Sequence, residues 1–177
     1  MLIEYLKEND KGRKIFYLET GKKFREFIKG KTHASKLSRK IYEDGDLQPS
    51  FLAVWTWADV LVENLVGDEH LVIDGTPRKL REAHILDSAF KFFGRFPAHI
   101  IFINVSKDWS RERLMERGRQ DDVDKEDVER RLHWFDTDVA PTIEMYKDNS
   151  DYHFVEINGE QTIPEVHEEV MQKLHLK

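Results

Sequence analysis

The sequence predicts an α/β protein with a parallel sheet, because short apolar runs alternate with helical patterns along the whole chain. The apolar runs have the length of buried strands and lie at residues 15–18, 71–73, 100–105 and 152–157. Helices between successive strands make them parallel, with right-handed crossovers. The length of 177 residues and the 40% hydrophobic content suit one domain over residues 1–177.

Eight helices are predicted from apolar spacing and from residues that start or stop helices. Pro49 suits a first turn, Gly45 ends a helix, and Gly94 with Pro97 ends the helix before the third strand. The predicted helices span residues 20–29, 34–43, 49–66, 79–93, 106–117, 125–136, 139–148 and 163–174. One of them carries large apolar side chains that we expect in the core: Phe51, Leu52, Trp55 and Trp57.

Composition excludes several classes of protein. A net charge of −6 argues against broad binding to nucleic acid or anionic membranes, although 28 basic residues leave room for a local cationic pocket. Without cysteine the chain has no disulfides and no thiolate chemistry, and the eight histidines are too scattered for a metal-ligand spacing. No apolar run has transmembrane length, and residues 1–12 are too charged for a signal peptide. We therefore expect a soluble cytoplasmic protein with no metal bound directly by its side chains.

The most informative segment is Leu71–Arg78, where an apolar strand runs into Asp74, Gly75, Thr76, Pro77 and Arg78. In an open α/β sheet, ligands bind at the carboxyl ends of the strands. Asp74 and Arg78 are therefore candidates for a phosphate and metal site. The alternative is a strand followed by an ordinary turn, since Gly and Pro punctuate turns in many proteins.

A second junction between strand and helix carries polar groups at Glu19, Thr20 and Gly21, and Arg25 follows about one helical turn later. A glycine at a helix N-terminus gives a ligand access to backbone N–H groups, and Arg25 is placed to bind an anion there. The alternative is a routine N-cap at Thr20 with Arg25 on the surface.

The richest basic cluster contains Arg113, Arg117 and Arg119, with Arg131 one helix later. Arg113 and Arg117 are four residues apart and share a helical face. Guanidinium groups match phosphate oxygens bidentately, so this cluster could enclose a triphosphate. A solvated helix surface with ion pairs to the neighbouring glutamates is the alternative.

The order of these segments resembles the adenylate kinase and nucleoside-monophosphate kinase family over nearly the whole chain. Thr20 and Gly21 with Arg25 are similar to the family's monophosphate-binding Thr-Gly and arginine. The turn at residues 45–49, with Gln48, resembles the turn whose backbone contacts the acceptor nucleoside. Asp74–Arg78 resembles the family's Asp-Gly-Phe-Pro-Arg motif.

The resemblance implies a P-loop-kinase-like three-layer α/β/α fold that transfers the γ-phosphoryl group of ATP to a nucleoside monophosphate, with AMP favoured. It implies that Mg²⁺ arrives with ATP and is organised through water by Asp74, while Thr20, Gly21, Gln48, Gly75 and Arg78 bind the monophosphate. Residues 20–49 would form the monophosphate-binding part and residues 117–130 a short lid. A full-length family member is expected to be a monomer, and self-association is possible for this chain.

On the donor side, the resemblance places Arg113, Arg117, Arg119 and Arg131 around ATP and the transferring phosphoryl group. Arg78 would join Arg117, Arg119 and Arg131 as a catalytic group. Asn158 and Gly159 resemble the loop beside the donor adenine. The short segment between Arg117 and Arg131 is similar to that of members with a small lid and no zinc-binding insertion.

The chain departs from the family in one large respect, because it contains no Gly-x-x-x-x-Gly-Lys-Ser/Thr loop to hold the donor phosphates. Met1–Leu6 reads as the later half of the helix that should follow that loop. We expect about twenty residues, including the first, central strand, to be missing from a longer natural chain. The alternative is a descendant of the family that lacks this loop. Such a protein would bind nucleotides or a protein partner and would have no catalytic activity.

A smaller departure is Glu82, which stands where adenylate kinases carry a glutamine that reads the adenine edge. An ionised glutamate only accepts hydrogen bonds, whereas adenine N1 needs a donor. We hypothesise that Glu82 lies in the monophosphate site and weakens the preference for AMP. The alternative is a glutamate that faces solvent.

Overall fold

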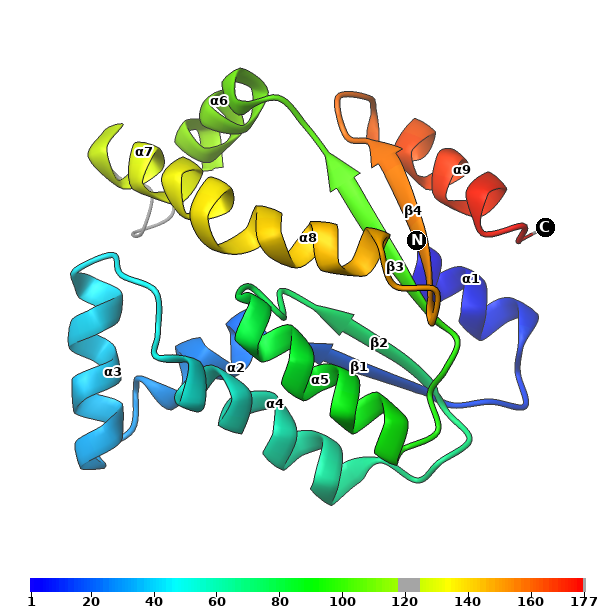
Figure 1. Ribbon diagram of the computed structural model, residues 1–177, viewed down its shortest axis with the longest axis horizontal. Coiled ribbons are helices and arrows are strands. Elements are labelled where there is room, and N and C mark those ends of the chain that lie inside the picture. The colour runs from blue at the N-terminus through cyan, green and yellow to red at the C-terminus, as the bar shows by residue number, and fades with distance from the viewer. Residues whose placement is uncertain (118–124, 177) are drawn as a thin grey trace. The chain divides into compact units, whose positions relative to one another are not determined.

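The computed structural model describes residues 1–117 and 125–176 (Figure 1). It is a mixed α/β structure in which every predicted helix and strand is found, with ends shifted by at most two residues. The elements in order are α1 (Leu2–Asn9), β1 (Ile15–Glu19), α2 (Thr20–Phe27), α3 (His33–Glu43), α4 (Ser50–Asn64), β2 (His70–Asp74), α5 (Leu80–Phe92), β3 (Ala98–Asn104), α6 (Lys107–Arg117), α7 (Lys125–Trp134), the π-helical turn η2 (Phe135–Val139), α8 (Ala140–Lys147), β4 (Tyr152–Asn158) and α9 (Ile163–Lys173). No helix among these described residues is long and apolar enough to cross a membrane.

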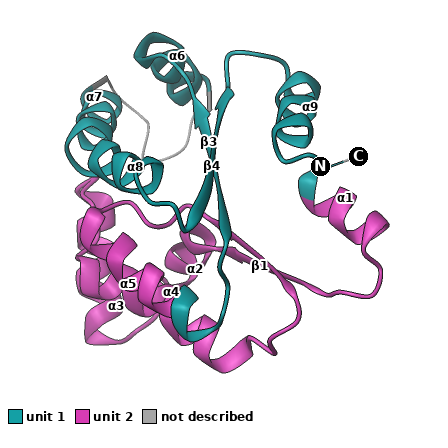
Figure 2. Cartoon of the chain, turned by 45° about the vertical axis from the view of Figure 1, so that its right-hand side comes forward, with its two compact units in different colours: residues 1–2, 90–177 teal, residues 3–89 magenta. Residues whose placement is uncertain are grey.

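The chain folds as two compact units, coloured separately in Figure 2. The amino-terminal unit comprises residues 3–89, and the carboxy-terminal unit comprises residues 1–2 and 90–177. Each unit contains one pair of parallel strands, so the predicted parallel pairing is confirmed. The prediction joined all four strands in one sheet, whereas the structure has two sheets of two strands each.

In the amino-terminal unit, β1 and β2 pair from Ile15 opposite His70 to Glu19 opposite Asp74. This register ends both strands at the same edge, so the segments that leave them start side by side. Leu18, Leu61 and Trp57 form part of the buried core beneath the sheet and helices. The core therefore fixes the two strand ends from which the candidate site is built.

The prediction that all four large apolar residues of α4 are buried is only half right. Leu52 is buried and Trp57 is 1% exposed, but Phe51 is 74% and Trp55 46% exposed. An α-helix turns 100° per residue, so neighbouring residues face different sides and one run of aromatics cannot all enter the core. Trp55 instead packs against Phe27 of α2, with ring centroids 5.2 Å apart.

In the carboxy-terminal unit, β3 and β4 pair from Ala98 opposite Tyr152 to Asn104 opposite Asn158. Tyr152 anchors an aromatic cluster, with its ring centroid 4.8 Å from Tyr146 and 5.3 Å from Phe96. The edge-to-face geometry of these pairs is the arrangement that aromatic rings prefer. The cluster packs at the amino ends of the two strands, and their in-register pairing places the carboxyl ends of β3 and β4 next to each other.

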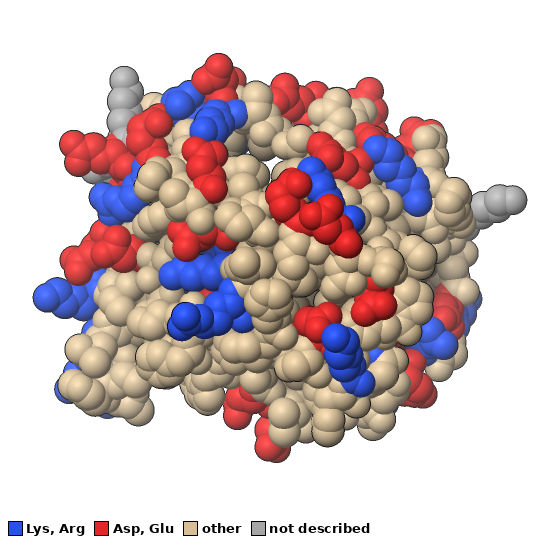
Figure 3. Space-filling view, in the orientation of Figure 1, with Lys and Arg blue, Asp and Glu red and all other residues tan. Residues whose placement is uncertain are grey.

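Acidic and basic side chains mingle over the face shown in Figure 3, and neither sign forms a broad field there. That pattern agrees with the modest net charge of −6. An anion site on this face would therefore depend on a few well-placed cations, in agreement with the local cationic pocket for which the sequence leaves room.

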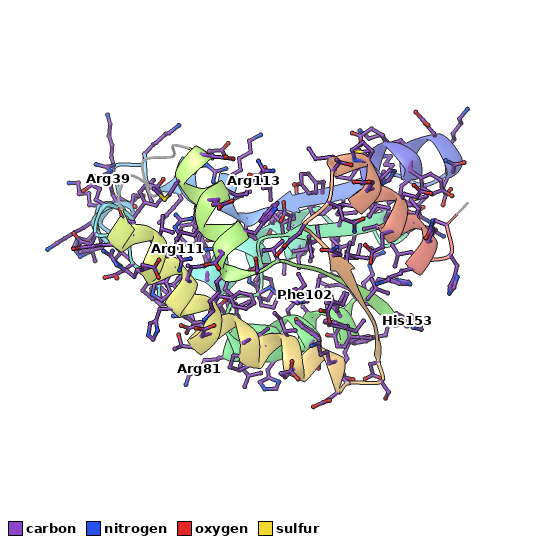
Figure 4. The ribbon with its side chains drawn as sticks, turned by 90° about the horizontal axis from the view of Figure 1, so that it is seen from above. Arg39, Arg81, Phe102, Arg111, Arg113 and His153 are labelled. Carbon is purple, nitrogen blue, oxygen red and sulfur yellow. The ribbon has the colours of Figure 1, made fainter. Side chains whose placement is uncertain are left out.

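Two histidines that are far apart in the sequence lie beside each other on β3 and β4. His99 and His153 are register partners, and their ring centroids are 5.0 Å apart (His153 is labelled in Figure 4). Burial lowers the pKa of His99 from its usual range, and the neighbouring His153 lowers it further. The folded protein therefore favours the neutral form of His99.

We expect the protein to lose stability when the pH falls from about 7.5 to about 5.5, because in that window the unfolded chain binds a proton at His99 more readily than the folded chain does. The stability linked to His99 is present above its unfolded pKa and is lost as the pH falls through that value. Urea-unfolding midpoints at the two pH values measure the loss. His99→Gln should lose less than the wild type, and equal losses would contradict the prediction.

Candidate active site

The carboxyl ends of β1 and β2 are joined by a side chain that the sequence singled out. The hydroxyl of Thr20 donates a hydrogen bond to the backbone oxygen of Asp74 over 3.1 Å. Glu19, not Thr20, is the N-cap of α2, and it makes no capping bond with its side chain. The alternative of a routine N-cap at Thr20 is therefore wrong, and its hydroxyl instead ties the two strand ends together.

Two glycines keep the backbone at this edge close to its neighbours. Gly75 has a φ of 82°, and a Cβ there would lie 3.1 Å from the hydroxyl of Thr20. A Cβ on Gly21 would lie 3.2 Å from the Nη1 atom of Arg25. A side chain at either position would push against a group of the candidate site, and at Gly75 it would also be strained.

Arg25 lies over the start of α2 and pairs with an acid from the end of β1. Its Nη2 atom is 2.9 Å from Oε1 of Glu19, and its side chain is 44% exposed. The alternative placed Arg25 on the surface, and it agrees with this exposed fraction of the side chain. The ion pair nevertheless holds the guanidinium group beside Gly21, at the edge where Thr20 and Asp74 meet.

Asp74 is held by a tyrosine that sequence reasoning missed. The hydroxyl of Tyr17 donates to Oδ2 of Asp74 over 3.1 Å. Burial raises the pKa of Tyr17, and the hydrogen bond to Asp74 raises it further, so the hydroxyl keeps its proton. The signal was present in the pairing of the strands, because Tyr17 lies opposite Val72, two residues before Asp74 and on the same face.

Arg78 leaves the turn after β2 with both its side chain and its backbone engaged. Its Nε atom donates to the backbone oxygen of Gly75 over 3.2 Å. Its backbone N–H donates to Oε2 of Glu82 over 3.0 Å, and the N–H of Lys79 donates to the same oxygen over 3.3 Å. Glu82 is 3% exposed, so the alternative of a glutamate facing solvent is wrong.

Both polar atoms of the Gln48 side chain form hydrogen bonds within the predicted monophosphate-binding segment. Its Oε1 atom accepts from the hydroxyl of Ser38 over 2.8 Å, and its Nε2 atom donates to the backbone oxygen of Ser38 over 2.9 Å. Arg39, labelled in Figure 4, donates to the backbone oxygens of Ile28 and Gly30. Ser38 and Arg39, which sequence reasoning missed, therefore hold α3 to the segments on either side of it.

A second group of candidate residues lies at the carboxyl ends of β3 and β4. The N–H of Gly159 donates to the backbone oxygen of Asn104 over 2.8 Å. A Cβ on Gly159 would lie 2.5 Å from Cγ1 of Val105 and 2.7 Å from Cγ2 of Ile103. Only glycine fits this close approach without a shift of the neighbouring strand.

A cavity of about 500 Å³ opens beside this loop, and its lining includes Asn104, Ser106, Asn158, Glu156, Glu160 and Glu169. Sequence reasoning missed the three acids, which come from β4, the loop after it and α9. A hydrogen bond from Ser106 lowers the pKa of Glu160, and one from Lys173 lowers the pKa of Glu169. The cavity is therefore polar, with negative side chains already bonded to neighbours.

The predicted arginine cluster of the carboxy-terminal unit is only partly described. Arg113 pairs with Glu116 over 3.0 Å and lies 5.1 Å from the ring centre of Trp109 (Figure 4), so its contacts are those of the salt-bridged alternative. Arg117 is the last residue of α6, and Arg131 is half-buried in the last turn of α7. Arg119 lies outside the described residues, as does much of the predicted lid at residues 117–130.

An arginine that sequence reasoning did not select connects α6 with α7. Arg111 is 2.6 Å from Oε1 of Glu129 and 2.5 Å from Oδ1 of Asp108 (Figure 4). These hydrogen bonds raise the pKa of Arg111 and keep it charged. Arg111 therefore orients the two helices that carry Arg113 and Arg131.

The family model for adenylate kinase matches residues 7–151, which is most of the chain. The chain belongs to the adenylate kinase family. It is 31% identical over 170 residues to an adenylate kinase of Flavobacterium psychrophilum, a match that covers 92% of this chain and 85% of that protein. It is 29% identical over 160 residues to adenylate kinase 1 of a Nostoc species, covering 90% and 85% of the two chains. Human adenylate kinase isoenzyme 5 is 31% identical over 157 residues, covering 85% of this chain and 26% of that protein.

The adenylate kinase family is a family of phosphotransferases, which typically use magnesium together with ATP. The described residues contain no group of three or more histidine or acidic side chains arranged so that it could hold a metal ion. Magnesium in such proteins is usually held by one or two carboxylates together with substrate phosphates and water. Asp74, an exposed carboxylate at the edge where β1 and β2 end, fits that mode of binding.

Proposed function

We propose that this chain is a nucleoside-monophosphate kinase that transfers the γ-phosphoryl group of ATP reversibly to a monophosphate, with AMP as the favoured acceptor. The observation that carries the proposal is the edge formed by β1 and β2, where Thr20, Gly21, Arg25, Asp74 and Gly75 gather. The proposal includes a P-loop-kinase-like three-layer arrangement. Family membership supports both parts.

The chemistry of this edge suits recognition of a monophosphate. The first backbone N–H groups of α2 have no partner within the helix, as at any helix N-terminus, and Gly21 has no side chain to cover them. Arg25 and Arg78 add two guanidinium groups from the same unit, and such groups bind phosphate oxygens in bidentate pairs. Thr20 and Gly75 keep the two segments in register, so the phosphate would bind a preformed frame.

Phosphoryl transfer needs alignment and charge stabilisation more than it needs a nucleophilic side chain. Arginines stabilise negative charge as it spreads over the moving phosphoryl oxygens, and Mg²⁺ supplies further positive charge when it is bound with ATP. Asp74 would hold water of that ion, and Tyr17 would keep the carboxylate in place. On the donor side, Arg113, Arg117, Arg119, Arg131 and the loop at Gly159 are the proposed ATP-binding groups.

The direct test is to incubate this chain with Mg²⁺ and ATP and to quantify the diphosphates formed from AMP, GMP, CMP and UMP. We expect turnover, with AMP the best acceptor. A folded chain that converts none of the four would overturn the catalytic proposal for it. A catalytically dead chain with specific ATP or AMP binding, measured by calorimetry, would support the second candidate.

The second candidate is a non-catalytic domain of the same family that binds nucleotides or a protein. The observation that favours it is that the sequence contains no glycine-rich loop ending in lysine. Such a loop wraps the donor phosphates with its backbone N–H groups and its lysine. Arginines alone leave those phosphates with fewer donors, so binding without turnover is the behaviour that separates the two candidates.

A further inference from the structure

Glu82 is one of few charged residues of the described chain whose side chain is almost wholly buried. It is 3% exposed and lies in the first turn of α5. The backbone N–H groups that precede a helix have no partner in the helix itself. The side chain of Glu82 is the partner of two of them here. Its Oε2 atom accepts from the N–H of Arg78 over 3.0 Å and from the N–H of Lys79 over 3.3 Å.

Lys79 is the residue from which α5 starts, because its backbone oxygen accepts from the N–H groups of Glu82 and Ala83. A glutamate three residues later that reaches back to this position forms half of a capping box. Its negative charge also lies at the positive end of the helix dipole. The two backbone N–H groups and the helix dipole therefore interact favourably with the buried carboxylate of Glu82.

These contacts fix Arg78 from two directions. Its peptide N–H is held by Glu82, and its Nε atom is held by the backbone oxygen of Gly75. Gly75 in turn rests against the hydroxyl of Thr20, which bonds to Asp74. Glu82 therefore belongs to the frame that aims the phosphate-binding arginine.

We propose that Glu82 is a positioning residue for Arg78 and does not read the base of the acceptor. Glu82 then supports binding of the monophosphate group that all acceptors share, and this position contributes no preference among bases. This inference rests on the proposed function. It is supported by the Oε2 atom, which is already shared by the N–H groups of Arg78 and Lys79, and by the side chain, which is only 3% exposed.

A base-reading role predicts a different outcome from a positioning role. A carboxylate that read the base would favour bases with an N–H at the edge, such as guanine, over adenine. Its replacement by an amide would then change the ranking of GMP against AMP. A carboxylate that positions Arg78 acts on the phosphate that all monophosphates share, so its replacement changes their affinities together.

The test compares Glu82→Gln with the wild type in KM and kcat for AMP, GMP, CMP and UMP. We expect Glu82→Gln to raise all four KM values by a common factor of roughly 5 to 50, the range for weakening one charge-assisted hydrogen bond. We expect kcat and the KM for ATP to change much less. A shift of more than about tenfold in the AMP to GMP ratio, or four unchanged KM values, would overturn the inference.

A matched control exists in the carboxy-terminal unit. Glu165 of α9 makes the same kind of cap, with its Oε2 atom accepting from the N–H of Thr162 over 2.9 Å. Glu165→Gln removes a charged cap of the same type at a position outside the proposed site. It should leave all four KM values within about twofold of the wild type, which separates loss of a helix cap from loss of Arg78 positioning.

A second measurement needs no activity, so failure of the proposed function can be told apart from failure of this inference. Amide hydrogen exchange of Arg78 and Lys79, followed by NMR in the ligand-free protein, reports their bonds to Glu82 directly. We expect both amides to exchange at least about tenfold faster in Glu82→Ala than in the wild type. Unchanged exchange would overturn the positioning role even in a chain that binds no monophosphate.

Discussion

Replacement of Arg78 by alanine is expected to lower kcat/KM for the acceptor monophosphate by about 10²- to 10³-fold, the usual effect of removing one preorganised donor from a developing charge. Gly75 and Glu82 hold Arg78 before any ligand binds, so its side chain loses little conformational entropy when it binds phosphate. Steady-state kinetics with AMP varied at saturating ATP measures the loss.

Two further variants sharpen this result. Arg78→Lys keeps the charge and loses the planar fork, so it should recover only part of the activity. Arg13→Ala removes an arginine that precedes the amino end of β1, whereas the site residues lie at the carboxyl ends of β1 and β2, and its ion pair with Asp10 is long, at 3.8 Å. It should leave kcat/KM within about twofold of the wild type. Equal kinetics for Arg78→Ala and Arg13→Ala would rule out a role for Arg78 in the site.

Replacement of Gly159 by alanine is expected to lower the free energy of unfolding by about 1–3 kcal/mol, as overpacking does elsewhere. The added Cβ would lie 2.5 Å from Val105, 2.7 Å from Ile103 and 3.1 Å from the backbone oxygen of Asn104. These atoms belong to β3 and the residue after it, so the loop must move away from the strand. Chemical denaturation gives the change in stability directly.

The movement of this loop should also be visible at the neighbouring cavity, because Asn104 and Asn158 line it. If the cavity holds the donor base, Gly159→Ala will weaken ATP binding more than AMP binding. Gly12→Ala is the matched control, since the nearest atom to its new Cβ would be 3.9 Å away. It should change the free energy of unfolding by less than about 0.5 kcal/mol, and an equally stable Gly159→Ala would contradict the close approach.

The sequence predicted the elements well because its apolar periods and helix stops are local. Gly45 and Gly94 have positive φ values of 72° and 64° just after their helices, as the C-terminal signals required. The strand ends at Glu19 and Asp74 were also predictable, because apolar residues stop there and charged residues begin. The contact of Thr20 with Asp74 was not predicted, because it depends on the pairing of β1 with β2, which the sequence analysis did not assign.

The groups that sequence reasoning missed depend on contacts across the fold. Tyr17 reaches Asp74 only because β1 and β2 pair in one particular register. His99 and His153 are 54 positions apart and meet only through the pairing of β3 with β4. Sequence reasoning selected Glu82 but left its burial open, because that burial accompanies local bonds to backbone N–H groups and has no periodic apolar signature.

The ion pair between Arg25 and Glu19 gives the site a built-in competitor for anions. The guanidinium group already has a carboxylate partner at 2.9 Å, so an incoming anion gains only the difference between its own attraction and that of Glu19. Chloride or a single carboxylate offers no more than Glu19 does, whereas a dianionic phosphate offers more charge and more acceptor oxygens. The acid beside the arginine thus disfavours monoanions such as chloride relative to a dianionic phosphate group, and the ion pair holds the arginine in place before a phosphate binds.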